Sequence, residues 1–265
     1  MSGAGRIRVG VGGWTYAPWR ETFYPKSVPQ KDELSYAAGV LTAIEINGTF
    51  YRSQKPETFA KWRASVPDGF VFTLKAPRFA TNRKVLAEGG ESIARFVASG
   101  IAELGDALGP ILWQFAATKR FDAADFGAFL DLLPAEAGGI PLRHAVEVRH
   151  DSFKDPEAVA LVRRHGVAIV RAVDAKYPDI ADLSADFAYL RLMGTVEGEP
   201  LGYGEAALDA HAAALKTLAA GGSPADAPLN APPAAKTPRD VFAFVIAGHK
   251  EANPAAAQAL IARVG

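Results

Sequence analysis

The 265-residue chain contains no cysteine, which excludes disulfide bonds, zinc sites built on thiolates and cysteine nucleophiles. It also has no excess of charge, because lysine plus arginine and aspartate plus glutamate both number 29. A neutral chain lacks the broad positive surface that nucleic acids and anionic membranes require, although a local basic pocket is compatible with it. We therefore expect a small polar or anionic molecule as partner, and neither a membrane nor nucleic acid.

The sequence has no apolar run long enough to span a bilayer. Residues 1–8 are polar and lack the apolar core of a signal peptide. We therefore expect a cytoplasmic protein.

Short apolar segments alternate with amphipathic ones along the whole chain. Strands are predicted at 7–12, 42–48, 70–76, 111–115, within 144–153, and at 167–173, 188–193 and 241–247. Helices are predicted at 31–41, 57–65, 91–108, 122–133, 156–165, 205–220 and 254–263, with a short, weak one at 178–184. Eight strands alternating with about eight helices are typical of a (β/α)₈ TIM barrel, and a doubly wound open sheet is the alternative.

No change in composition divides the chain, so we expect a single domain over residues 1–265. Residues 221–238 are rich in alanine, proline and glycine and contain few large apolar side chains. This composition predicts a long surface loop before the last strand, which we expect to be mobile.

The stretch from 144 to 153 places Glu147 and Arg149 on one face of a strand and Val146 and Val148 on the other. Charged groups on a buried strand are unfavourable unless they are paired or bind a ligand. The outer face of a barrel strand packs against helices and is apolar, so polar positions at strand ends should point inward. The positions selected in this way are Glu45, Asn47, Lys75, Gln114, Glu147, Arg149 and Arg191.

These residues predict a polar layer at the C-terminal mouth of the barrel, with a charge of +1 that suits a phosphate or carboxylate group. Glu45 or Glu147 could act as general acid or base, and Lys75 as an electrostatic group or, if desolvated, as a Schiff-base amine. Trp14, Tyr16 and Tyr51 could form an aromatic wall beside Asn47, Gln114, Arg149 and Arg191. The alternative is a structural ion-pair network in which these charges satisfy one another.

The five histidines, at 144, 150, 165, 211 and 249, fit no short metal-binding motif. We therefore expect no metal and no cofactor. His165 and His211 lie on predicted helices and are expected at the surface, whereas the roles of His150, His249 and Asp174 stay open.

Three functions are compatible with this pattern. The favoured one is an enzyme acting on a small phosphorylated or acidic, sugar-like molecule. The second is a glycoside hydrolase using Glu45 and Glu147, for which the separation of the two carboxyl groups would indicate the mechanism. The third is a non-catalytic protein that binds a metabolite or nucleic-acid ends.

The chain also resembles the YecE-like family of TIM-barrel proteins, domain of unknown function 72. The matching stretches are 12–14 (GGW), 23–25 (FYP), 45–52 (EINGTFYR), 75–76 (KA), 111–115 (ILWQF), 147–152 (EVRHDS) and 191–194 (RLMG). The resemblance implies a TIM barrel but no agreed activity. Many members carry histidine where this chain has Asn82 and Met193, and a pair of asparagines where it has Gly248 and His249.

Overall fold

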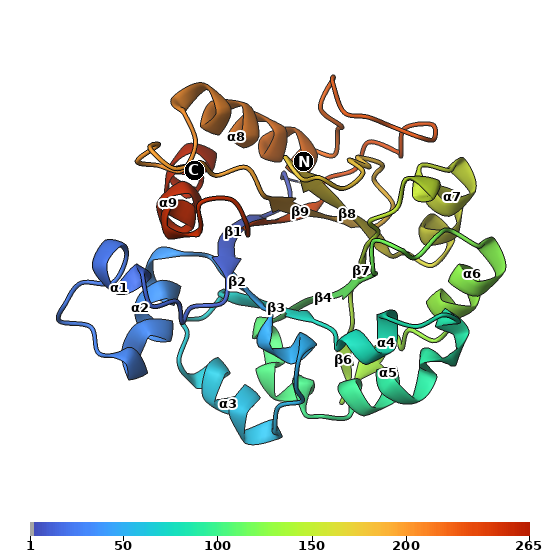
Figure 1. The fold of residues 1–265 in the computed structure, drawn as a ribbon, viewed down its shortest axis with the longest axis horizontal. Coiled ribbons are helices and arrows are strands. Elements are labelled where there is room, and N and C mark those ends of the chain that lie inside the picture. The colour runs from blue at the N-terminus through green and yellow to red at the C-terminus, as the bar shows by residue number, and fades with distance from the viewer. Residues whose placement is uncertain (1–2) are drawn as a thin grey trace.

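The computed structural model describes residues 3–265, and its centre is a closed barrel of eight parallel strands (Figure 1). The barrel strands are β1 (Ile7–Gly12), β2 (Ala43–Ile46), β3 (Val71–Lys75), β4 (Leu108–Gln114), β7 (His144–Glu147), β8 (Ala168–Val173), β9 (Phe187–Leu192) and β10 (Asp240–Val245). The strand β1 pairs with both β10 and β2, so the sheet has no open edge. This closure confirms the predicted TIM barrel and rules out the doubly wound sheet.

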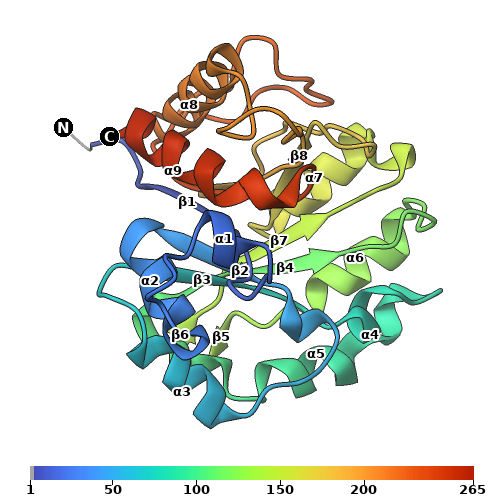
Figure 2. The same cartoon turned by 60° about the vertical axis from the view of Figure 1, so that its left-hand side comes forward.

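Helices form a ring outside the strands (Figure 2). They are α1 (Trp19–Thr22), α2 (Glu33–Val40), α3 (Pro56–Ala64), α4 (Arg78–Thr81), α5 (Gly90–Val97), α6 (Ala123–Asp131), α7 (Pro156–Arg164), α8 (Glu205–Ala219) and α9 (Asn253–Val264). Short 3₁₀ segments lie at Gln30–Asp32, Gly48–Phe50, Leu86–Gly89, Ile101–Ala107, Asp151–Phe153 and Lys250–Ala252. A two-stranded hairpin, β5 (Glu136–Ala137) with β6 (Ile140–Pro141), precedes β7. No helix of the described residues is both long and apolar enough to cross a bilayer.

The helix predicted at 91–108 is the clearest departure from expectation. Its α-helical part, α5, ends at Val97, and a 3₁₀ segment follows Gly100. Gly100 has φ 102°, and a Cβ at this position would lie 2.6 Å from the Cα of Pro56. The apolar spacing of the sequence continues past the end of α5 because Ile101, in the 3₁₀ segment, is also buried in the core. Leu108, the last residue of the predicted helix, is the first residue of β4. The weak helix predicted at 178–184 does not form.

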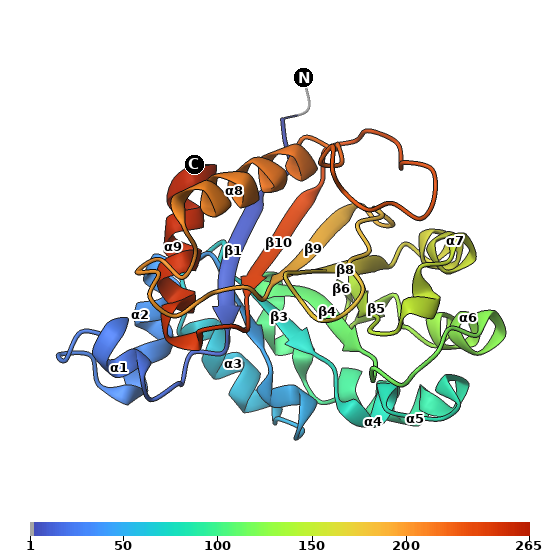
Figure 3. The same cartoon turned by 45° about the horizontal axis from the view of Figure 1, so that its top comes forward.

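The segment 221–238 contains no helix or strand and lies between α8 and β10 (Figure 3). Two buried side chains hold it. The Asp182 carboxylate accepts hydrogen bonds from the backbone amides of Asn230 (2.9 Å) and Ala231 (3.0 Å). The Arg239 guanidinium donates to the carbonyls of Thr237 and Ala235, each at 2.8 Å. The predicted loop is therefore present and anchored in its middle and at its C-terminal end, and its mobility stays a prediction.

The barrel encloses an apolar core of its own, separate from the core between strands and helices. Its buried residues are Ala43, Val71, Leu112, Ala145, Ala168, Val170, Phe187, Tyr189, Phe242 and Phe244. Because side chains alternate along a strand, these residues identify the inward-facing positions of each strand. They also fix which residues face inward at the C-terminal end.

Candidate active site

Polar side chains continue the inward-facing rows of five strands. Glu45 lies two residues beyond Ala43, and the same spacing relates Gln114 to Leu112 and Glu147 to Ala145. Lys75 is four residues beyond Val71, and Arg191 is two beyond Tyr189. The structure therefore brings these five residues together at the C-terminal end of the barrel, as strand parity predicts. We call these five residues and Arg149 the charged layer.

Arg191 is the centre of the charged layer. Its Nη2 donates to Glu45 Oε1 at 2.9 Å, and its Nη1 donates to Glu147 Oε2 at 2.5 Å. The Nη1 group also lies 3.3 Å from Gln114 Oε1. Both glutamate side chains are fully buried and Arg191 is 3 % exposed, so one guanidinium joins two carboxylates away from water. Buried charges of this kind are stable only when they are paired.

Arg149 closes the same network on the side nearer to solvent. It follows β7, and its Nε donates to Glu147 Oε1 at 2.6 Å while its Nη2 donates to Gln114 Oε1 at 2.6 Å. The ring of Tyr177 lies 4.2 Å from the guanidinium carbon. The Arg149 side chain is 17 % exposed, so it is the charged arm of the layer that still reaches water.

Both oxygens of Glu45 are also occupied. One accepts from Arg191, and the other accepts from the hydroxyl of Tyr189 at 2.7 Å. The Tyr189 oxygen lies 3.0 Å from Thr73 Oγ1, so the chain of hydrogen bonds extends to β3. Burial, together with the nearby Glu45 carboxylate, raises the pKa of Tyr189 well above its ordinary value. Tyr189 therefore stays a hydrogen-bond donor to Glu45.

The charges around Glu147 and Arg191 keep both side chains ionised. Burial alone would raise the pKa of Glu147, but Arg191 and Arg149 outweigh it and hold that pKa below its ordinary value. Burial would likewise lower the pKa of Arg191, yet Glu147 and Glu45 raise it. Glu147 is therefore a carboxylate at neutral pH and a poor proton donor.

Lys75 is the exception in the charged layer. Its side chain is 7 % exposed, and its Nζ lies 4.2 Å from the ring centroid of Phe50. Within residues 3–265, its Nζ makes no hydrogen bond or ion pair. Burial, with the nearby Arg191, lowers its pKa to about 8, although Glu45 and Glu147 oppose the shift. Roughly a tenth of the Lys75 side chains are then neutral amines at pH 7.

The aromatic wall predicted from Trp14, Tyr16 and Tyr51 does not form as expected. The chain turns at Gly13, which has φ 72°, and the Trp14 ring lies edge-on to Trp62 of α3 at 5.4 Å. Tyr16 packs against Trp19 in the same way. Both rings belong to the outer layer. Tyr51 is 66 % exposed at the mouth, so its binding role stays a prediction.

Three aromatic contacts of the site were missed by the sequence argument. Phe50 lies beneath Lys75, Tyr177 covers Arg149, and Tyr189 donates to Glu45. Strand parity could have identified Tyr189, because it shares a face with Arg191. Tyr177 lies in a loop, where no periodicity applies.

The remaining polar candidates lie beside the charged layer or apart from it. Asn47 is partly buried and its Nδ2 lies 3.4 Å from the carbonyl oxygen of Glu45. His150 Nδ1 accepts a hydrogen bond from the backbone amide of Ser152 and so caps the 3₁₀ segment Asp151–Phe153. The expectation of a surface position for His211 was wrong, because its side chain is 16 % exposed, with Nε2 3.7 Å from Asp174 Oδ2.

A cleft of about 730 Å³ opens at the same end of the barrel, between the segments that follow β3 and β4. Four of its lining residues are cationic and two are anionic: Arg83, Lys84, Lys119, Arg120, Asp122 and Asp125. Thr81 also lines it, is fully buried, and has a hydroxyl with no partner among the described residues. No cluster of three or more histidine, aspartate or glutamate side chains suited to a metal ion occurs in residues 3–265.

A closed parallel barrel with a charged layer at the C-terminal end of its strands is a TIM barrel with the site position usual for that fold. Residues 8–265 match the family described as protein of unknown function DUF72, so the chain belongs to the DUF72 family. The resemblance inferred from its motifs is thereby confirmed. It is also similar to the UPF0759 protein YecE of Escherichia coli K12, with 27% identity over 150 residues. That match covers 56% of this chain and 50% of YecE, so the chain spans about half the length of the curated relatives it matches.

Solved structures show the same fold. A DUF72 family protein from Thermotoga maritima has a TM-score of 0.71 and 21% identity, covering 97% of both chains. One from Enterococcus faecalis has a TM-score of 0.66 and 14% identity, also covering 97% of both chains. A xylose isomerase-like TIM barrel/4-hydroxyphenylpyruvate dioxygenase fusion protein has a TM-score of 0.51 and 15% identity. The match covers 95% of this chain and 41% of the fusion protein. Identities this low establish the fold alone.

Proposed function

We propose that this protein is an enzyme that acts on a small phosphorylated or acidic, sugar-like molecule at the C-terminal mouth, with Lys75 as the reacting amine. The observation that carries the proposal is that Lys75 is buried without a carboxylate partner and has its pKa lowered to about 8. A desolvated lysine of this kind is a nucleophile for carbonyl carbon.

The charged layer would position and stabilise that amine rather than transfer protons. Both glutamates are fully buried, and each forms a salt bridge with Arg191 near Lys75. Arg149 remains partly exposed and can donate to an oxyanion on the substrate. The cationic cleft lined by Lys84 and Arg120 supports a phosphate or carboxylate at the other end of the molecule.

The chemistry that follows is imine formation. The neutral Lys75 amine attacks a substrate carbonyl carbon. The carbonyl oxygen takes up one proton from the amine and one from solvent and leaves as water, which gives a protonated imine. The positive imine lies near two buried carboxylates, which stabilise it. Such an imine permits proton abstraction or carbon–carbon cleavage at the adjacent carbon, so an isomerase or a lyase fits better than a hydrolase.

The same contacts count against a glycoside hydrolase. That mechanism needs one carboxylic acid with a raised pKa and a second carboxylate free to attack or to activate water. Here Glu147 has its pKa lowered, and both carboxylates make direct salt bridges to Arg191. The arrangement offers neither group.

A non-catalytic binding protein is the second candidate, and the full internal pairing of Glu45 and Glu147 favours it. In that case Glu147→Gln would leave ligand affinity intact and no turnover would be found. Loss of turnover with binding retained would favour the enzyme.

Trapping with sodium borohydride tests the proposal directly. The protein is incubated with phosphorylated aldoses and ketoses and with sugar-derived oxo acids, and then reduced. Hydride reduction of the imine gives a secondary amine, so intact mass increases by the substrate less one oxygen atom. We expect an adduct that maps to Lys75, is lost in Lys75→Met and persists in the control Lys61→Met, an exposed lysine of α3. Labelling that is equal in both variants would contradict the proposal.

A further inference from the structure

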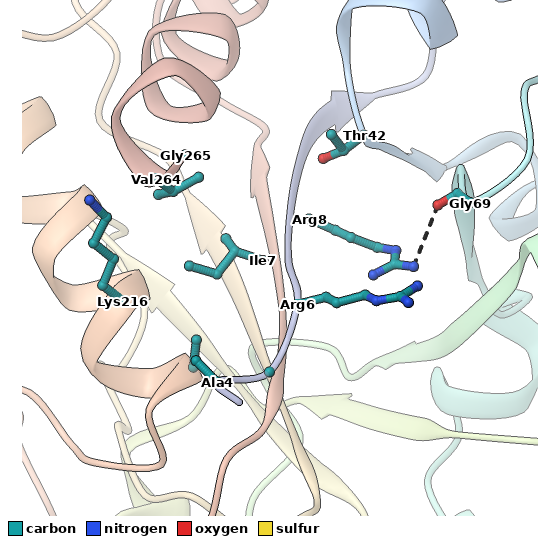
Figure 4. Close-up of a pocket in the computed structure, with 11 residues that line it drawn as sticks. Ala4, Arg6, Ile7, Arg8, Thr42, Gly69, Lys216, Val264 and Gly265 are labelled. Atoms are coloured by element: carbon teal, nitrogen blue, oxygen red, sulfur yellow. Dashed lines mark hydrogen bonds between the residues drawn. The ribbon is translucent and has the colours of Figure 1, made fainter. Parts of the chain in front are cut away.

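A second cavity lies at the opposite, N-terminal end of the barrel, beside the beginning of β1. Its volume is about 510 Å³, and Arg6, Arg8, Thr42, Gly69 and Lys216 are among the residues that line it (Figure 4). The function proposed above uses none of these residues. In TIM barrels this end usually serves stability, so a cluster of charge here requires a separate explanation.

Three arginines lie near one another at this end. The side chains of Arg6 and Arg8 extend in the same direction from β1 and the residue before it (Figure 4). Arg143, just before β7, is the third, and its guanidinium carbon lies 4.9 Å from the ring of Phe242 on the barrel floor. Arg8 points into the barrel, because Val9 and Val11 belong to the outer core.

The hydrogen-bonding capacity of Arg8 is largely unused. Its Nη2 lies 3.4 Å from the carbonyl oxygen of Gly69, which is a long contact. Its Nε is buried and has no partner in the part of the chain that the structure describes. Buried donors without a partner are rare in folded proteins, and a bound ion or an ordered water is a common explanation.

The negative charge at this end is smaller than the positive charge. Asp240 accepts from the backbone amide of Arg6 at 2.9 Å, and its other oxygen lies 3.5 Å from Arg143 Nη1. Asp240 is thus the one carboxylate named beside three arginine side chains, and these four groups together carry a charge of +2. Burial lowers the pKa of Arg8, Asp240 opposes this, and Arg6 and Arg143 lower it further. The cluster is thus repulsive until an anion enters it.

We infer that Arg6, Arg8 and Arg143 form a binding site for the phosphate group of a small molecule at the N-terminal end of the barrel, separate from the C-terminal mouth. A tetrahedral phosphate offers enough oxygens to accept from three guanidinium groups at once, whereas a planar carboxylate offers two. The ammonium group of Lys216, across β1 in Figure 4, adds positive potential to the same cavity. The inference does not depend on the function proposed for Lys75.

Titration calorimetry with inorganic phosphate, at constant ionic strength, tests this site. We expect saturable binding that weakens about tenfold in Arg8→Lys and in Arg6→Gln, because each loses one charge-assisted contact. Arg6 is exposed, so Arg6→Gln keeps the fold intact even if a change at Arg8 disturbs it. Acetate should bind more weakly than phosphate.

Two controls separate this site from other positive surfaces. Arg164→Gln removes an exposed charge from the end of α7, and Arg120→Gln removes one from the C-terminal cleft. Both variants should retain the phosphate binding that calorimetry shows to be lost in Arg6→Gln. A crystal soaked in phosphate should show density between Arg6, Arg8 and Arg143. Absence of saturable binding, equal loss in the control variants, or acetate binding as tightly as phosphate would overturn the assignment.

Discussion

Replacing Lys75 by methionine should stabilise the protein at pH 7 while abolishing the proposed imine chemistry. Lys75 is buried, its Nζ lacks a carboxylate partner among residues 3–265, and burial lowers its pKa from 10.5 to about 8. The charged form is therefore unfavourable in the folded state. Methionine keeps a similar volume and removes the charge.

The magnitude follows from that pKa. The difference between 10.5 and about 8 corresponds to about 3 kcal/mol, since each pKa step of one is worth about 1.4 kcal/mol. Methionine forfeits the contact between the ammonium group and Phe50, which is worth about 0.5–2 kcal/mol. We therefore expect the free energy of unfolding to rise by about 1–3 kcal/mol in Lys75→Met at pH 7.

The sign of the pH dependence gives a stricter test. Between about pH 8 and 10.5 the unfolded chain keeps a proton on Lys75 that the folded protein has released, so the wild type gains stability as pH rises. The advantage of Lys75→Met should shrink over this range. Urea denaturation of both proteins and of Lys61→Met, at pH 7, 8 and 9.5, measures the difference. A destabilised Lys75→Met at pH 7, or a difference independent of pH, would refute the argument.

Three further outcomes follow from the contacts. Arg191→Met should lower the free energy of unfolding by about 3–5 kcal/mol in urea denaturation, because it leaves the carboxylates of Glu45 and Glu147 buried without their shared partner. In Glu147→Gln the loss at pH 7 should diminish as pH falls below 4.5 in acid-denaturation curves, because the lowered pKa of Glu147 stabilises the fold only while the group is ionised. Gly194→Ala should lower the thermal midpoint, because its Cβ would lie 2.6 Å from the Cβ of Asp174. Adding Asp174→Gly to that variant should restore the midpoint, because it removes the opposing Cβ at a residue with φ 56°.

The order of strands and helices could be predicted from sequence because periodicity is local, whereas periodicity left the open sheet as an alternative to closure. Each strand carries its own apolar run, and the predicted 7–12 strand agrees with β1 in both bounds. The boundary error between 91 and 108 has a different origin. The helical spacing was real, but Gly100 adopts a left-handed conformation and lies against Pro56, which is distant in sequence and leaves no room for a Cβ. Contacts of that kind are not visible in periodicity.

For the site, the inward direction of the side chains could be predicted from the sequence. The contacts between them could not, for a similar reason. Parity along each strand gave the inward direction of Glu147 and Arg191 without any knowledge of their partners. It could not show that Arg191 would bind both glutamates, since that depends on the register between β2, β7 and β9. Trp14 was misplaced because it follows a strand, where the chain turns at Gly13 and alternation no longer applies.

The division of charge within the layer explains why an amine, and not a carboxylate, is the reactive group we favour. Two carboxylates and two guanidinium groups in the layer cancel one another through direct contacts, and each of these four residues has a partner for its charge. The net charge of +1 then belongs to Lys75, the one charged member of the layer without a partner among residues 3–265. A purely structural network has no need of this fifth charge, because removing it would lower the electrostatic energy of the folded state. Its presence at the mouth of the barrel, at an energetic disadvantage, is what a reacting group would require and a structural one would not.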